Sequence, residues 1–234
     1  MEVVITRLTP YKEKDYIVNA LSAEGFITFR ASGALGVKSK FAGKLFLYAF
    51  VDIEVKDTKL GYSLTNIESL NNIAKIFTDY NKIIALNLIG EIIQKTIKDD
   101  ESAIETFSLV KNVLKGLPTT NHLYSMIYLF ISNLLRLLGL GLVVDKCVSC
   151  GKKEAIIGVD YYRGGLICGN CANQDTMYLS PESIKILRYA FMIDEEQLFR
   201  HEFETQEVKE LLKRIIKQIE ETYNFKIISN DLLS

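Results

Sequence analysis

Apolar and polar residues alternate over the first 67 residues in short runs that are typical of β-strands. The runs are rich in Val, Ile, Phe and Tyr, and turn signals such as Thr9-Pro10 and Glu24-Gly25 separate them. The pattern predicts five strands, at 2–8, 15–22, 26–32, 44–55 and 60–67. Five strands in so small a unit indicate a closed or nearly closed barrel, because closure leaves few exposed sheet edges. We therefore expect an OB-type barrel over residues 1–67.

The fourth predicted strand, 44–55, has two distinct faces because side chains alternate along a strand. One face is aliphatic and is expected to fill the barrel. The other face carries aromatic residues led by a lysine, namely Lys44, Phe46, Tyr48 and Phe50. This row is either a platform on which unpaired bases stack, as in OB barrels that hold single strands, or a surface that packs against the next domain.

After about residue 68 the apolar residues recur at helical spacing. Helices are predicted over 82–97 and over 102–115, where Asp99-Asp100 precedes the second of them. A long apolar helix follows a predicted cap at Thr119-Thr120-Asn121 and ends at Gly139 and Gly141. Another helix is predicted to begin at Ser180-Pro181-Glu182. The last predicted helix has an apolar stripe from Val208 to Tyr223. The fold class is α+β, with a helical bundle over residues 68–234 that carries a cysteine hairpin.

All four cysteines lie in two C-x2-C pairs that 17 residues separate. This spacing predicts a structural zinc site with four thiolate ligands, because each pair presents two sulfurs and tetrahedral zinc needs four. The ligands would be Cys147, Cys150, Cys168 and Cys171. A redox dithiol or a disulfide framework is the alternative. A catalytic zinc site is disfavoured because four cysteines would occupy all four coordination positions and leave none for water. His122 and His201 lie far from the cysteines in sequence and are not part of a zinc-hydrolase motif.

Composition gives an ordinary globular chain of 234 residues with 48% hydrophobic residues, 24% charged residues and a net charge of −1. This balance excludes a globally basic nucleic-acid binder but not a local basic patch. The N-terminal residues lack the features of a secretory signal, so we expect a cytoplasmic, nucleoid-associated protein. The apolar run at 123–144 could span a bilayer by length, but Asn133 and Arg136 would lie within the span, which favours a buried helix.

Charge is segregated in the segment 25–51, which has basic residues and no acidic ones. Together with two aromatic residues of the fourth predicted strand, these are the candidate DNA-binding residues: Arg30, Lys38, Lys40, Lys44, Phe46 and Tyr48. Lys38-Ser39-Lys40, between Gly36 and Gly43, indicates a mobile basic loop. It does not match the phosphate-binding loop G-x-x-x-x-G-K-[ST], so we expect no nucleotide hydrolysis.

The order of these parts resembles the RecO family of bacterial recombination mediators over essentially the whole chain. The residues that look like the first hairpin of that family are Tyr11, Glu13, Asp15, Ile17, Val18, Leu21 and Glu24-Gly25. Gly33 with Ser39 look like its basic loop. The stretches Cys147-Val148-Ser149-Cys150-Gly151 and Gly164-Gly165-Leu166-Ile167-Cys168-Gly169-Asn170-Cys171 look like its zinc segment.

The resemblance implies an OB fold that binds single- and double-stranded DNA and anneals complementary strands. It also implies partnership with RecR and the single-strand binding protein SSB, which helps RecA to load during repair, and no catalytic residues. The chain departs from the family in the loop after the third strand. The family usually has arginines there, at the positions of Ala34, Leu35, Gly36 and Val37 in this chain. The alternative hypothesis is a protein-docking adaptor that zinc stiffens and that has little DNA affinity of its own.

Overall fold

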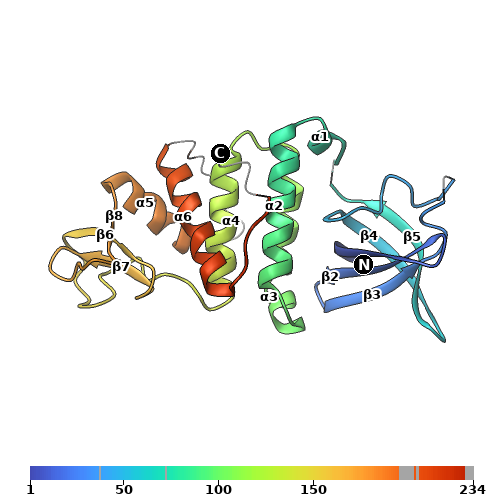
Figure 1. The fold of residues 1–234 in the computed structure, drawn as a ribbon, viewed down its shortest axis with the longest axis horizontal. Helices are drawn as coiled ribbons and strands as arrows, with labels where there is room; N and C mark the ends of the chain where they lie inside the picture. The colour runs from blue at the N-terminus through green and yellow to red at the C-terminus, as the bar shows by residue number, and fades with distance from the viewer. Residues whose placement is uncertain (37, 72, 195–202, 204–205, 230–234) are drawn as a thin grey trace. The chain divides into compact units, whose positions relative to one another are not determined.

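The computed structural model describes residues 1–36, 38–71, 73–194, 203 and 206–229 (Figure 1). The chain forms two compact units. The first contains Met1–Thr119 and the segment that starts at Ile227, and the second contains Thr120–Lys226. Val37, one of the four loop residues that depart from the family, and His201 lie outside the described residues.

The first unit is built on a closed barrel of five strands in the order β1-β2-β3-β5-β4. The strands are β1 Glu2–Tyr11, β2 Asp15–Ser22, β3 Gly25–Ala31, β4 Phe50–Thr58 and β5 Gly61–Ser69. Antiparallel pairing of β1 with β4 and parallel pairing of β3 with β5 close the barrel. Its interior is filled by aliphatic and aromatic side chains such as Ile5, Val18, Phe29 and Ile53. The structure confirms the expected OB-type barrel.

The fourth strand differs from the prediction. It begins at Phe50 rather than at residue 44, and the described residues of the segment before it, 32–36 and 38–49, contain turns and no strand. The backbone explains the difference, because Gly43 and Tyr48 have φ values of 74° and 63°, which a β-strand does not tolerate. The prediction of two alternating faces from Lys44 onwards was therefore wrong, and Phe50 is fully buried.

Three helices belong to the first unit: α1 Ile73–Phe77, α2 Tyr80–Thr96 and α3 Asp100–Gly116. Asp79 and Asp99 cap α2 and α3, and Asp99 forms a capping box with Ser102. The helices are tied to the barrel by hydrogen bonds. Phe26 N donates to Asp100 Oδ1 (2.7 Å), and the ammonium group of Lys111 lies 2.8 Å from Glu2 Oε2. A functional boundary at residues 67 and 68 remains a prediction.

The second unit packs three helices around a buried centre: α4 Leu123–Leu137, α5 Pro181–Met192 and α6 Gln206–Tyr223. Two buried polar side chains of α4 bond to the backbone of the same helix: Ser132 Oγ donates to Tyr128 O and Asn133 Nδ2 donates to Leu129 O. Within the part of the chain that the structure describes, no helix is long and apolar enough to cross a membrane. The predicted cap of α4 was displaced: His122 occupies the N-cap, and the hydroxyl of Thr120 accepts a hydrogen bond from His122 N.

A small antiparallel sheet completes the second unit, with strands in the order β7-β6-β8. The strands are β6 Ile156–Asp160, β7 Gly165–Cys168 and β8 Met177–Tyr178. The hairpin of β6 and β7 agrees with the expected turn at Arg163-Gly164-Gly165. The two-residue strand β8 was not expected, because so short a segment has no periodicity of its own. Ser180 then caps α5 as predicted.

Candidate metal centre and nucleic-acid interface

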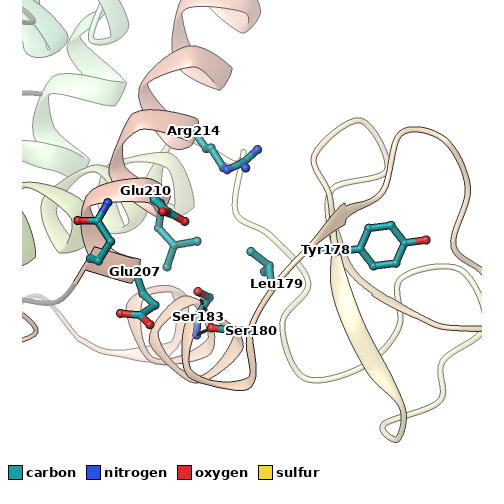
Figure 2. A pocket seen from close by; sticks show the side chains of 9 residues that line it. Tyr178, Leu179, Ser180, Ser183, Glu207, Glu210 and Arg214 are labelled. Atoms are coloured by element: carbon teal, nitrogen blue, oxygen red, sulfur yellow. Dashed lines mark hydrogen bonds between the residues drawn. The ribbon is translucent and has the colours of Figure 1, made fainter. Parts of the chain in front are cut away.

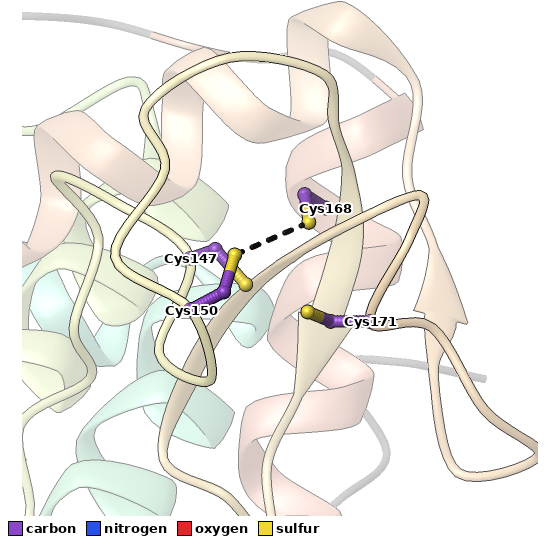
Figure 3. A group of neighbouring side chains, drawn as sticks. All are labelled: Cys147, Cys150, Cys168 and Cys171. Carbon is purple, nitrogen blue, oxygen red and sulfur yellow. Dashed lines mark hydrogen bonds between the residues drawn. The ribbon is translucent and has the colours of Figure 1, made fainter.

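The four cysteines meet at one end of the small sheet (Figure 3). Their Sγ atoms all lie within 4.8 Å of one another, and the Sγ atoms of Cys150 and Cys168 are 3.7 Å apart. In a tetrahedral site with Zn–S bonds of about 2.3 Å, neighbouring sulfurs are about 3.8 Å apart. The cluster therefore has the size that a tetrahedral thiolate-bound metal requires.

The local chain geometry explains why the sulfurs converge. In the first pair, Cys147 N donates to Lys152 O (2.7 Å) and Gly151 N donates to Cys147 O (2.9 Å). Gly151 has a φ of 75°, which a glycine adopts without strain. In the second pair, Cys171 N donates to Cys168 O (3.0 Å). Each pair is thus a tight turn, and the hairpin of β6 and β7 brings the second turn back to the first.

The pKa values of the thiols indicate how the cluster holds charge. Burial raises the pKa of Cys147, but the backbone N–H groups of Cys168, Cys150 and Ser149 outweigh burial and lower that pKa to about 6. Hydrogen bonds with Cys150 and Cys168 raise the pKa of Cys171 to about 12, and the charge on Cys147 adds to the effect. The same contacts therefore favour the ionised form of Cys147 over that of Cys171. A divalent cation would supply the positive charge that lets further thiols ionise.

The four predicted basic residues do not form one open patch. Arg30 Nε donates to Asp15 Oδ2 (2.9 Å), so a carboxylate already holds this guanidinium. Lys40 Nζ donates to Thr65 O (2.7 Å) and Lys44 Nζ donates to Ile67 O (3.0 Å). The pairing of β3 with β5 ends at Arg30 and Ser63, and the two lysines donate to carbonyls farther along β5. Of the four, Lys38 is exposed and has no polar partner among the described residues.

The two predicted stacking aromatics contact helices. Tyr48 is only 6% exposed, and a Cβ added to Gly90 of α2 would lie 2.4 Å from its ring, so the ring rests on bare helix backbone. Burial raises the pKa of Tyr48 to about 12. The ring of Phe46 meets Phe77 of α1 edge to face at 5.8 Å. These contacts fit the packing interpretation of the aromatic row, and a role of either ring in DNA binding stays a prediction.

A different aromatic residue is available on the outside of the barrel. Tyr11, at the end of β1, is 42% exposed. The Cζ atom of Arg30 lies 5.6 Å from the ring centroid, and the Nζ atom of Lys12 lies 5.3 Å from it. The register places Tyr11 opposite Asp15 and Ile17 opposite Arg30, so Tyr11, Asp15 and Arg30 share the outer face. Sequence reasoning missed this cluster because strand register, not spacing, brings the residues together.

A cleft in the second unit offers less to nucleic acid. It encloses about 150 Å³ beside β8 and α6 and is lined by residues that include Glu207, Glu210 and Arg214 (Figure 2). The lining has two carboxylates and one guanidinium, so the cleft does not favour binding of a negatively charged phosphate backbone. The outer face of the barrel is therefore a better candidate interface for nucleic acid than this cleft.

Comparison with known proteins assigns the chain to a family. The family model described as "Recombination protein O C terminal" matches residues 78–228. Several proteins named "DNA repair protein RecO" are similar along most of their length. That of Listeria innocua is 25% identical over 95% of this chain and 88% of its own. That of Bacillus pumilus is 26% identical over 95% and 86%, and that of Caldanaerobacter subterraneus subsp. tengcongensis is 25% identical over 85% and 82%. The chain belongs to the RecO family, whose members with these names are DNA repair proteins.

Proposed function

We propose that the chain is a non-enzymatic mediator of recombinational DNA repair. It would bind single- and double-stranded DNA on the outer face of its barrel, anneal complementary strands and assist RecA loading on SSB-coated DNA. Its partners would be DNA, RecR and SSB, with RecA indirectly, and its cofactor a structural zinc ion held by the four cysteines. The observation that carries the proposal is the exposed Tyr11 ring with Lys12 and Arg30 beside it, on a barrel of OB topology in a RecO-family chain.

The contacts of Arg30 explain how this face could hold an unpaired base. Hydrogen bonds to Gly33 N and to Arg30 lower the pKa of Asp15, so its carboxylate stays ionised and fixes the guanidinium. A fixed guanidinium beside a tyrosine gives a flat, cationic platform that suits any base, because every base has a π-face. Lys12 and Lys38 have no ion-pair partner among the described residues and are free to meet phosphates. OB barrels generally bind oligonucleotides on strands 2 and 3 and the loop between strands 1 and 2, where this platform lies.

The test is fluorescence anisotropy of a labelled single-stranded oligonucleotide with Tyr11→Leu and Tyr11→Phe. Stacking on one aromatic ring contributes about 1–3 kcal/mol per base. We therefore expect Tyr11→Leu to weaken binding by about 5- to 150-fold. Tyr11→Phe keeps the ring and serves as the matched control, with affinity close to that of the wild type. Equal affinity of all three proteins would exclude Tyr11 as a stacking residue.

The second candidate is the protein-docking adaptor. It is favoured by the internal partners of Lys40 and Lys44, and by the burial of Tyr48, because these residues are already occupied within the chain. An adaptor would keep its complexes with SSB and RecR after Lys12 and Lys38 are neutralised, and would bind DNA weakly by itself. Loss of DNA binding with partner binding unchanged would instead show that the two activities reside on separate surfaces.

A further inference from the structure

One side chain contacts both cysteine pairs. Arg163 lies in the turn between β6 and β7, and its Nη1 donates to Ser149 Oγ (3.1 Å) and to Cys171 O (3.3 Å). Ser149 is inside the first C-x2-C pair, and Cys171 ends the second. The guanidinium therefore bridges two segments that are far apart in sequence and that must stay together for four sulfurs to hold one ion.

A buried carboxylate fixes the other side of this guanidinium. Arg163 Nε lies 3.3 Å from Asp160 Oδ2, and the Asp160 side chain is only 1% exposed. The backbone N of Arg163 donates to Asp160 Oδ1 (3.0 Å). A carboxylate removed from water needs a charged or hydrogen-bonding partner. Asp160 thus orients Arg163, whose rigid planar fork can then satisfy Asp160 and both cysteine pairs at once.

We propose that Arg163 strengthens metal binding at the cysteine centre by holding the two pairs together and by offsetting the charge of the thiolates. Four thiolates and one divalent zinc ion carry a net charge of −2, that is 4 × (−1) + 2. Groups that contact metal ligands in this way change metal affinity about 10- to 100-fold when they are removed. The inference rests on the proposed zinc site.

A turn that merely needs Arg163 for folding would show the same hydrogen bonds, so the test separates the two roles. Arg163→Met removes the guanidinium but keeps the backbone N–H that bonds Asp160 Oδ1, and circular dichroism checks that the turn survives the loss of the ion pair. Arg163→Lys keeps the charge but loses the fork. Lys153→Met removes an exposed cation from the segment that joins the two cysteine pairs, and it is the matched control for charge.

The experiment measures transfer of zinc from the full-length proteins to a competing chelator, the absorption spectrum of the cobalt(II)-substituted proteins, and circular dichroism. We expect Arg163→Met to bind zinc about 10- to 100-fold more weakly than the wild type, with unchanged circular dichroism and cobalt bands of reduced tetrahedral intensity. Arg163→Lys should be intermediate, and Lys153→Met should match the wild type.

Three outcomes would overturn the inference, and they are distinguishable. If the wild type holds zinc and Arg163→Met holds it equally tightly, Arg163 has no role at the metal centre, although the centre stands. If the wild type binds neither zinc nor cobalt, the metal centre fails and the inference fails with it. A loss of zinc in Lys153→Met equal to that in Arg163→Met would also contradict it, because any nearby cation would then suffice.

Discussion

The cysteine element and the loop 32–49 are both conspicuous in the sequence, the first by spacing and the second by charge. In the cysteine element, all four expected ligand atoms lie within 4.8 Å of one another. In and beside the loop, the four expected cations are separated: Arg30 binds Asp15, while Lys40 and Lys44 bind backbone carbonyls of β5. The spacing of the cysteines predicts the geometry of a metal site. The number of basic residues in a segment does not reveal which of them already have partners inside the protein.

The largest effect is expected from removal of one metal ligand. Cys171→Ser should lose the bound zinc and unfold the small sheet, because structural zinc contributes on the order of 10 kcal/mol to such elements. Asn170→Ser, an exposed neighbour inside the same C-x2-C pair, is the matched control and should keep the metal. Metal analysis and thermal unfolding measure both. Retention of zinc and stability by Cys171→Ser would make the cysteine cluster something other than a four-thiolate site.

A moderate effect is expected where Tyr48 packs on α2. Gly90→Ala adds a Cβ into the ring of Tyr48, so either the ring or the helix must shift. Overpacking of this kind costs about 1–3 kcal/mol. Asn87→Ala, on the exposed side of the same helix, should not destabilise the protein to this extent. Chemical denaturation measures the difference. An unchanged unfolding free energy for Gly90→Ala would mean that Tyr48 can leave α2 without cost and could face a ligand.

The smallest effect concerns pH. Because the pKa of Asp15 is lower in the folded chain than its ordinary value, its ionised form stabilises the fold above the unfolded pKa of about 3.9. This contribution is lost as the pH falls through the folded pKa. Asp15→Asn should therefore lower the melting temperature near pH 7, and the difference from the wild type should shrink in strong acid. A constant difference from pH 7 to pH 2 would contradict the ionised pair with Arg30.

Much of the architecture follows from periodicity and capping. The spans of α2 and α3, the Ser180 cap and the cysteine hairpin could be predicted because each depends on residues close together in sequence. The closed barrel, whose closing pairs are far apart in sequence, was instead predicted from the number of short strands in a small unit. The start of β4 could not, because the positive φ of Tyr48 arises where its ring packs against Gly90, 42 positions away in the chain. The Tyr11 and Arg30 cluster was hidden for a related reason, since it depends on the register of three strands.

The central claim is that DNA meets Lys12 and Lys38, which have no ion-pair partner among the described residues, and not the lysines that already bind β5. The most direct test compares the salt dependence of single-stranded DNA binding for Lys12→Ala/Lys38→Ala and Lys40→Ala/Lys44→Ala. Each lost phosphate contact reduces the slope of log K against log salt by about 0.7–1. We predict a slope reduced by about 1.4–2 for the first pair and a slope close to wild type for the second. The reverse result would place the DNA on Lys40 and Lys44 and contradict the account.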